Sequence, residues 1–214
     1  MFGCVPFVIG LMYLLPSKNR AIRRGVSKAF ILLTGLSIRY EGIIDPEAQI
    51  IMLNHQSYLD VIALEAVHPN NLCWIAKKQL GEPFLYGHAL KAPRMILLDR
   101  EDKKGLVFLL KIAKERLDEE RVLAIFPEGT RSKGDGNLLP FKGGAKMIAQ
   151  KYDLLIQPFA LTKTRSIFDL AKLTLGGDQA RVIALPSFRP SQRDEHWLEE
   201  MRESIQRHIA QIQS

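Results

Sequence analysis

Two short polar segments carry the residue types that acid–base chemistry and anion binding require. The first segment, residues 54–60, reads Asn-His-Gln-Ser-Tyr-Leu-Asp and follows an apolar run with the pattern of a buried strand. If the chain folds His55 back over the turn that follows it, Asp60 can accept the proton of one imidazole nitrogen and leave the other nitrogen as a base. This pair is the second half of a Ser-His-Asp relay, without the serine.

A purely structural role for the same residues is the main alternative. Ser57 has the position of a helix N-cap and Asp60 that of its capping-box partner, so His55 would then be an ordinary loop residue. Taken alone, the segment favours this structural role. A zinc site is a weaker alternative, because His68, His88 and the two cysteines lack the spacing of metal ligands.

The second segment, residues 126–132, reads Phe-Pro-Glu-Gly-Thr-Arg-Ser. It begins at the last residue of another apolar strand pattern, residues 121–126. Gly129 allows backbone conformations that other residues resist, so amide N–H groups can turn towards a ligand. Arg131 supplies a planar guanidinium that matches two phosphate oxygens. Two glycines begin a predicted helix over residues 143–152, where the backbone can approach an anion. A polar surface turn explains any one of these residues, but much less readily the whole string.

In this order and spacing, the two segments resemble the motifs of the glycerophospholipid acyltransferase family. Within that family the chain is most similar to bacterial 1-acyl-glycerol-3-phosphate acyltransferases, over roughly residues 35–165. Residues 95–100 and 155–159 are similar to two further family blocks, and residues 76–80 resemble a lysine-containing stretch between the first two blocks. Three residues depart from the family pattern: Arg94 and Leu97 stand where the second block usually has glycine and phenylalanine, and Gln79 stands where a glutamate usually follows the lysine pair. These departures leave the identity of the acceptor and of the acyl chain open.

The resemblance implies transfer of a fatty acyl group from a thioester to a hydroxyl of a glycerol phosphate lipid. In that reaction His55 would deprotonate the acceptor hydroxyl, and Asp60 would orient the imidazole and stabilise its charged form. No acyl-enzyme intermediate is expected, because no serine or cysteine nucleophile accompanies the histidine. Ser57 is instead expected to act as an N-cap.

The expected acceptor is lysophosphatidic acid, with phosphatidic acid as the product. The residues that the resemblance assigns to acceptor binding are Lys77, Arg100, Glu128, Gly129, Thr130 and Arg131. Lys77 is the weaker candidate among them. The donor would be acyl carrier protein or coenzyme A as a co-substrate, with no metal and no other cofactor. Two alternatives remain: acylation of another lyso-lipid, such as a lyso-ornithine lipid, and a non-catalytic lipid-binding role at a membrane surface.

The positive charge of the chain is concentrated at its beginning. Residues 1–40 contain six basic and no acidic residues, whereas the remainder contains 24 basic and 23 acidic residues. Two apolar runs, residues 5–15 and 29–38, are too short to span a bilayer and are separated by a polar link over residues 16–24. We therefore predict a two-helix membrane-associating motif over residues 1–38, on the cytoplasmic face of the inner membrane.

A secretory signal and a nucleic-acid-binding arm are weaker interpretations of this charged segment. A secretory signal would carry its charge before the apolar run, and here the charge follows it. Nucleic-acid binding is not expected, because aromatic residues are not interleaved with the basic ones. The remaining alternative is a pair of helices that pack on the core of the protein.

Residues 39–214 are predicted to form one acyltransferase domain, in which strand and helix patterns alternate. The expected fold is α/β, with a mixed and largely buried sheet flanked by helices. Strands are predicted at residues 37–40, 50–53, 72–76, 95–98, 122–126 and 154–160, with a further pair at 171–175 and 182–185. Helices are predicted at residues 58–67, 106–117 and 143–152, and from Ser191 to the end of the chain.

Overall fold

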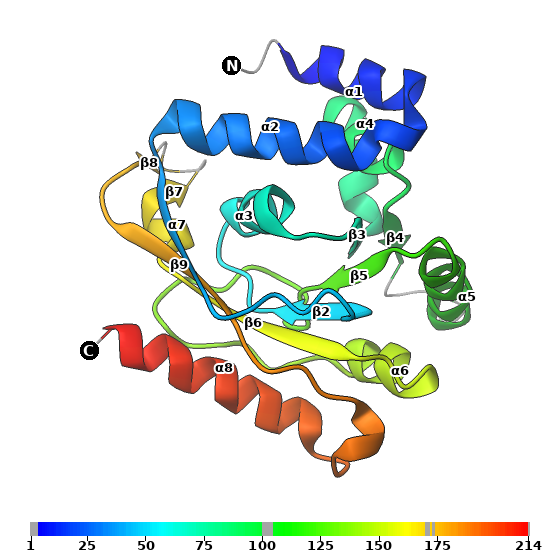
Figure 1. Ribbon diagram of the computed structural model, residues 1–214, viewed down its shortest axis with the longest axis vertical. Helices are drawn as coiled ribbons and strands as arrows, with labels where there is room; N and C mark the ends of the chain where they lie inside the picture. Colours follow the sequence, from blue (N-terminus) through cyan, green and yellow to red (C-terminus); the bar gives the residue numbers. More distant parts are fainter. Residues whose placement is uncertain (1–3, 100–104, 170–171, 173, 214) are drawn as a thin grey trace.

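A seven-stranded mixed sheet lies at the centre of the computed structural model, which describes residues 4–99, 105–169, 172 and 174–213 (Figure 1). Its strand order is β1-β9-β6-β2-β5-β3-β4; β9 and β6 are antiparallel, and all other neighbours are parallel. The strands of this large sheet are β1 Ser37–Glu41, β2 Ile50–Leu53, β3 Leu72–Lys77, β4 Ile96–Leu98, β5 Val122–Ile125, β6 Ile156–Thr162 and β9 Gln179–Ala184. A small antiparallel sheet consists of β7 Phe168–Asp169 and β8 Thr174–Leu175.

Every residue of the central strands β2, β5 and β6 is buried. A parallel strand covered on both faces needs apolar side chains at successive positions, not at alternate ones. The sequences Ile-Ile-Met-Leu of β2 and Val-Leu-Ala-Ile of β5 meet this requirement. The prediction of a mixed, largely buried sheet flanked by helices is confirmed.

Helices cover both faces of the sheet (Figure 1). The helices are α1 Val5–Leu14, α2 Asn19–Thr34, α3 Leu59–Val67, α4 Phe84–Lys91, α5 Gly105–Asp118, α6 Gly143–Lys151, α7 Thr164–Ile167 and α8 Trp197–Gln213. On one face α3 packs directly on the strands, and α2 lies across α3. On the other face α5, α6 and α8 bury their apolar side chains against the sheet.

The position of β8 corrects one strand prediction. Residues 171–175 were predicted as one strand, but the described strand β8 covers only Thr174–Leu175 and pairs with β7, and residues 170, 171 and 173 lie outside the described part of the chain. The later strand, β9, instead begins at Gln179 and pairs with both β1 and β6. Strand β9 carries the apolar residues Val182, Ile183 and Ala184, which are buried within the large sheet.

Two helix boundaries also differ from the prediction. Residues 16–24 were expected to form a polar link, but α2 begins at Asn19, so the link is only the 3₁₀ turn Pro16–Lys18. Lysine and arginine are good helix formers, and basic residues extend the helix without interrupting it. The last helix begins at Trp197 and not at Ser191, because residues 190–192 form a 3₁₀ turn. Helix α4 was not predicted.

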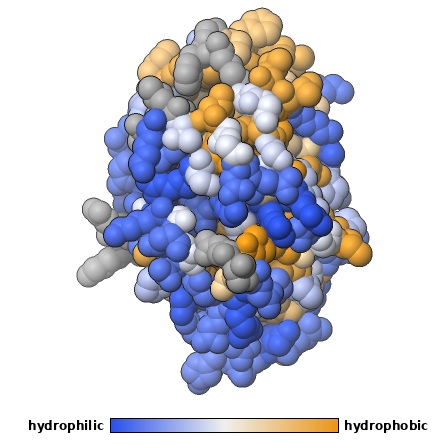
Figure 2. Space-filling model, turned by 90° about the vertical axis from the view of Figure 1, so that its left-hand side faces the viewer, coloured by the Kyte–Doolittle hydropathy of each residue, from blue (hydrophilic) through white to orange (hydrophobic). Residues whose placement is uncertain are grey.

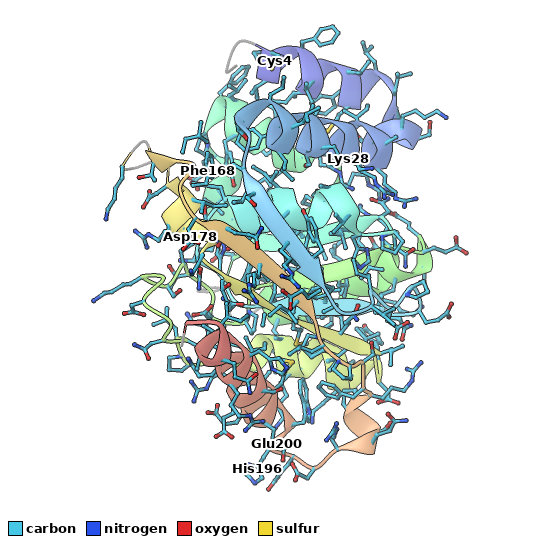
Figure 3. The ribbon with its side chains drawn as sticks, turned by 60° about the vertical axis from the view of Figure 1, so that its left-hand side comes forward. Cys4, Lys28, Phe168, Asp178, His196 and Glu200 are labelled. Atoms are coloured by element: carbon cyan, nitrogen blue, oxygen red, sulfur yellow. The ribbon has the colours of Figure 1, made fainter. Side chains whose placement is uncertain are left out.

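The N-terminal helices leave large apolar side chains exposed. The most exposed ones on α1 and α2 are Phe7 (71%), Leu14 (79%), Leu32 (81%) and Leu33 (76%). Hydrophobic residues gather at the end of the molecule formed by these helices, and the opposite end is hydrophilic (Figure 2). Cys4 and Lys28 lie near the apolar end, and His196 and Glu200 lie near the hydrophilic one (Figure 3). Within the described residues, every helix is too short or too polar to cross a bilayer.

Candidate active site

The two sequence motifs meet at one edge of the sheet, because the strands that carry them are parallel neighbours. Strand β5 lies between β2 and β3, and Ala124 pairs with Ile51 on one side and with Trp74 on the other. The carboxyl ends of these three strands therefore lie side by side. That register brings His55 and the loop after β5 together, which is where parallel sheets commonly build binding sites.

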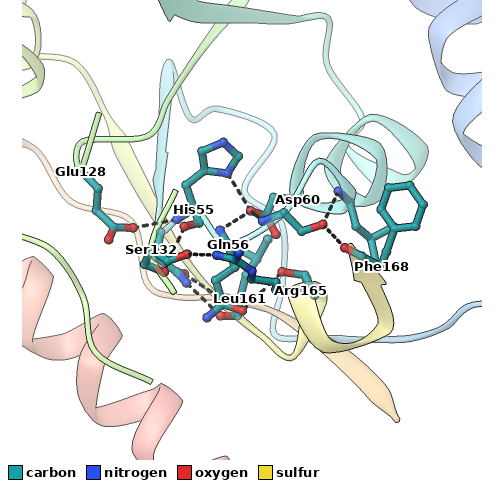
Figure 4. Close-up of polar contacts among 12 residues, drawn as sticks. His55, Gln56, Asp60, Glu128, Ser132, Leu161, Arg165 and Phe168 are labelled. Atoms are coloured by element: carbon teal, nitrogen blue, oxygen red, sulfur yellow. Dashed lines mark hydrogen bonds and ion pairs between the residues drawn. The ribbon is translucent and has the colours of Figure 1, made fainter. Parts of the chain in front are cut away.

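The predicted contact between His55 and Asp60 is present. The Nδ1 atom of His55 lies 2.8 Å from Oδ2 of Asp60 (Figure 4). The Asp60 side chain is fully buried, whereas that of His55 is 17% exposed. Because a carboxylate only accepts hydrogen bonds, the imidazole donates from Nδ1, and Nε2 is left to take a proton from a substrate.

The same aspartate also holds the turn that leads into helix α3. Oδ2 of Asp60 accepts the backbone N–H groups of Gln56 (2.7 Å) and Ser57 (2.9 Å). Ser57 in turn accepts the N–H of Leu59 at its Oγ, at 3.2 Å, although the N-cap of α3 is Tyr58, one residue after the predicted position. The structural and the chemical roles of this segment are therefore both supported, since one carboxylate oxygen contacts the helix start and the imidazole.

The second motif holds the backbone of His55 from both sides. Oε1 of Glu128 accepts the His55 N–H at 2.7 Å, while Ser132 donates its own N–H and its Oγ–H to the His55 carbonyl at 2.8 and 3.1 Å (Figure 4). The other Glu128 oxygen accepts the N–H of Leu139 at 2.8 Å. Burial raises the pKa of Glu128, and the two backbone donors act in the opposite direction. Through its two carboxylate oxygens, Glu128 thus links the backbone of His55 to the backbone of Leu139.

Arg131 is exposed and lies with its guanidinium carbon 4.4 Å from the centre of the Tyr58 ring. This cation–π contact keeps the cation beside the segment that carries His55. Tyr58 also contacts Tyr86 of α4 edge to face, with the ring centres 6.2 Å apart. The structure thus adds two tyrosines that sequence reasoning did not assign to the site; for Tyr58, its place inside the first motif was the available signal.

The other predicted site residues are placed as follows. Gly129 adopts φ +74°, the left-handed conformation that glycine tolerates, and Thr130 beside it is exposed. Lys77 is exposed at the carboxyl end of β3, on the same sheet edge as His55. Arg100 lies outside the described residues. Ser132 was part of the predicted motif but had no assigned role, and its contact with His55 spans 77 positions in the sequence.

An apolar cavity of about 240 Å³ lies next to the second motif. Its lining includes Leu106 and Leu109 of α5, Ile125 and Phe126 at the end of β5, and Gly144 of α6. In the described parts of the chain, no group of three or more His, Cys, Asp or Glu side chains is arranged to hold a metal ion.

Comparison with known proteins places this geometry in a family. Residues 37–162 match the family model described as Acyltransferase. The chain is 51% identical over 188 residues to a Helicobacter pylori protein named 1-acyl-sn-glycerol-3-phosphate acyltransferase, and the match covers 88% of this chain and 79% of that protein. The chain belongs to the acyltransferase family.

More distant relatives agree with this assignment. A Saccharomyces cerevisiae protein of the same name is 33% identical over 141 residues, which cover 64% of this chain but only 46% of the yeast protein. The crystal structure of the 1-acyl-sn-glycerophosphate (LPA) acyltransferase PlsC from Thermotoga maritima is similar, with a TM-score of 0.77 at 21% identity. That match covers 98% of this chain and 88% of PlsC, so the two proteins share the same fold.

The fully buried Asn54 follows β2, and its side chain continues the hydrogen bonding between β2 and β6 beyond the end of β2. Replacing it tests whether these hydrogen bonds stabilise the site. Its side chain donates to the Leu161 carbonyl at 2.9 Å and accepts the Leu161 N–H at 2.8 Å. Asn54→Ala would leave both backbone groups without a partner, so we expect a loss of about 3 kcal/mol in the free energy of unfolding, measured by urea denaturation. Asn70→Ala, which removes an exposed hydrogen bond to Pro46, is the control and should cost less than about 1 kcal/mol. Equal losses in the two variants would contradict this role for Asn54.

Proposed function

We propose that this acyltransferase moves a fatty acyl group from a thioester to the free sn-2 hydroxyl of 1-acyl-glycerol-3-phosphate, giving phosphatidic acid. The observation that carries the proposal is the 2.8 Å contact between His55 and a fully buried Asp60. It occurs in a chain that is 51% identical to a protein named for this reaction. No serine or cysteine nucleophile is needed, because a thioester is already activated.

The reaction begins when Nε2 of His55 takes the proton of the acceptor hydroxyl. The hydroxyl oxygen attacks the thioester carbonyl carbon, and the tetrahedral intermediate then breaks its C–S bond. The proton on the imidazolium passes to the departing thiolate, which leaves as a thiol. Asp60 stabilises the imidazolium through the Nδ1 hydrogen bond and sets the tautomer of the ring. General-base help of this kind contributes about 10²–10⁴-fold, and positioning of the two substrates supplies the rest.

The phosphate of the acceptor binds beside Arg131. An arginine held over the Tyr58 ring presents its planar N–H groups in a fixed direction, which suits two phosphate oxygens. Gly129 and Thr130 precede Arg131 in the same loop, and Lys77 and Arg100 complete the proposed set of cations. Glu128 contributes by holding the backbone of His55, because both of its carboxylate oxygens accept backbone N–H groups.

The apolar cavity beside Phe126 receives part of a fatty acyl chain. Its volume of about 240 Å³ is slightly below the roughly 300 Å³ at which ligand pockets usually start, so it holds a segment of the chain. The donor thioester is carried by acyl carrier protein or coenzyme A as a co-substrate, and the reaction uses no other cofactor. Both carriers are acidic, which suits the excess of seven positive charges on the protein.

Helices α1 and α2, which make up most of residues 1–38, associate with the membrane surface. Their exposed phenylalanine and leucines provide apolar area, and the exposed basic residues of α2, Arg20 and Lys28, attract an anionic leaflet at about 1 kcal/mol each. We place the enzyme on the cytoplasmic face of the inner membrane, where a lyso-lipid in the bilayer and a soluble acyl donor can meet at the site.

His55→Ala is the direct test of the mechanism. We expect kcat for lysophosphatidic acid to fall by at least about 10²-fold, because the general base is removed. The control is His196→Ala, a 75% exposed histidine at the hydrophilic end of the molecule, which should keep wild-type activity. The assay compares lysophosphatidic acid with lyso-ornithine lipid and other lyso-lipids, with one acyl carrier protein and one coenzyme A donor. Equal activity of wild type and His55→Ala would refute the mechanism, and preference for another lyso-lipid would refute the acceptor.

Two neighbouring glycines of α6 test the acyl pocket. A side chain added at Gly144 points into open space beside the cavity that Gly144 lines, so Gly144→Leu should shift the enzyme towards shorter acyl donors. Each CH₂ group displaced from an apolar pocket costs about 0.8 kcal/mol, or roughly fourfold in kcat/KM. Gly143→Leu has equal space and the same helix but lies outside the lining, so it should leave the preference unchanged. An unchanged chain-length profile in Gly144→Leu would place the acyl chain elsewhere.

Sedimentation with phosphatidylglycerol-containing vesicles tests membrane association. The double variant Leu32→Ser/Leu33→Ser removes two side chains that are more than three-quarters exposed, and we expect bound protein to fall about tenfold or more. The matched control, Ile43→Ser/Val107→Ser, removes two equally apolar side chains that are 87% and 71% exposed outside the N-terminal helices. Equal losses in both double variants would show that α2 has no special part in binding.

A further inference from the structure

Three aromatic rings form a column that ends at the proposed base. The His55 ring stacks on Phe126 with ring centres 3.8 Å apart and planes 16° apart. Phe126 in turn stacks on Trp74, with centres 5.2 Å apart and planes 19° apart. We call His55, Phe126 and Trp74 the ring column. Its members come from three positions far apart in the sequence, so it was not visible in either motif.

The sheet explains why the rings align. Side chains two residues apart on a strand share a face, and Trp74 pairs with Ala124, two residues before Phe126. His55 comes two residues after Leu53, which is buried on this same face of the sheet against α3. Neighbouring strands lie roughly 4.8 Å apart, a spacing that suits rings stacked from one strand to the next.

The far end of the ring column is fixed by a buried polar chain. The Trp74 indole donates its Nε1–H to Oε1 of Glu65 on α3, at 2.8 Å. Glu65 pairs with Arg23 of α2, and Arg23 also donates to the Asn71 side chain at 2.6 Å. Burial raises the pKa of Glu65, and the positive charge of Arg23 is the largest influence in the opposite direction. Trp74 is only 5% exposed, so its ring is held by packing on one side and by a hydrogen bond on the other.

We propose that Phe126 and Trp74 are positioning residues that fix the plane of the His55 imidazole, an inference that rests on the proposed function of His55 as the base. Asp60 contacts the ring at Nδ1 only, and one hydrogen bond leaves the ring able to swing about that atom. Stacking on Phe126 removes this freedom and sets the direction in which Nε2 points. Trp74 supports Phe126 from behind, and the Arg23–Glu65 pair ties this support to α2, the helix at the apolar end of the molecule.

The chain contains two tryptophans, which gives a matched test. Trp74→Leu should lower kcat about 10–100-fold and leave KM for lysophosphatidic acid within twofold, because a misdirected base slows chemistry without weakening binding. Trp74→Phe keeps a ring under Phe126 and should restore kcat to within about threefold of wild type. The control is Trp197→Leu, which removes a side chain that is 1% exposed on α8 and packs against Phe188. Rates are compared per folded molecule, with the folded fraction taken from circular dichroism.

A spectroscopic measurement separates positioning from general stability. An aromatic ring stacked on an imidazole shifts the imidazole proton resonances upfield, so the His55 Hε1 signal should be shifted in the wild type. The five histidine signals can be assigned by their loss in single variants, beginning with His55→Ala. In Trp74→Leu the His55 signal should move towards the position of an unstacked ring, and in Trp197→Leu it should not move.

The outcomes are distinct. Equal kcat losses in Trp74→Leu and Trp197→Leu, a raised KM in place of a lowered kcat, or an unmoved His55 signal would each overturn the positioning role. If His55→Ala abolishes activity while Trp74→Leu retains it, the positioning role of the ring column is refuted and the proposed mechanism stands. If His55→Ala retains activity, the proposed mechanism itself fails.

Discussion

The backbone of His55 depends on a carboxylate that comes from another part of the fold. Glu128 accepts the His55 N–H, and Ser132 donates twice to the His55 carbonyl, so the loop after β5 fixes the chain on both sides of the histidine. A buried carboxylate needs donors, and a backbone leaving a strand needs partners. Glu128 thus receives a backbone donor from the loop after β2, and that loop receives partners for the N–H and the carbonyl of His55.

Asp60 shows how one side chain can stabilise the fold and serve the chemistry. Its Oδ2 accepts two backbone N–H groups at the start of α3 and also contacts His55 Nδ1. The helix start keeps the carboxylate in place without a separate supporting group. His55 itself lies in the turn before α3, and its contact with Asp60 on the first turn of that helix lowers the cost of orienting the base.

The sequence predicted the parts of the site that depend on local order. His55 and Asp60 are five positions apart, and their contact follows from a turn and a helix start. The bounds of the strands in the large sheet were predicted mostly within one or two residues, because continuous apolar runs are typical of buried parallel strands. Contacts between distant segments were not predictable: Glu128 and His55 are 73 positions apart, and Arg23 and Glu65 are 42 apart. Trp74 was predicted only as a strand residue, since its stacking partner is set by strand order.

The order of strands in the sheet also has a consequence for how the protein is made. Strand β1 lies at the sheet edge and pairs with β9, and its residue Ser37 is 142 positions from its partner Gln179. At about 5–20 residues per second, a ribosome needs roughly 7–30 seconds to synthesise the intervening chain. During that time β1 has no partner in the sheet, while the helices before it have already left the ribosome. The N-terminal helices are thus complete before the sheet is, so the membrane association proposed for them can begin before β1 finds its partner.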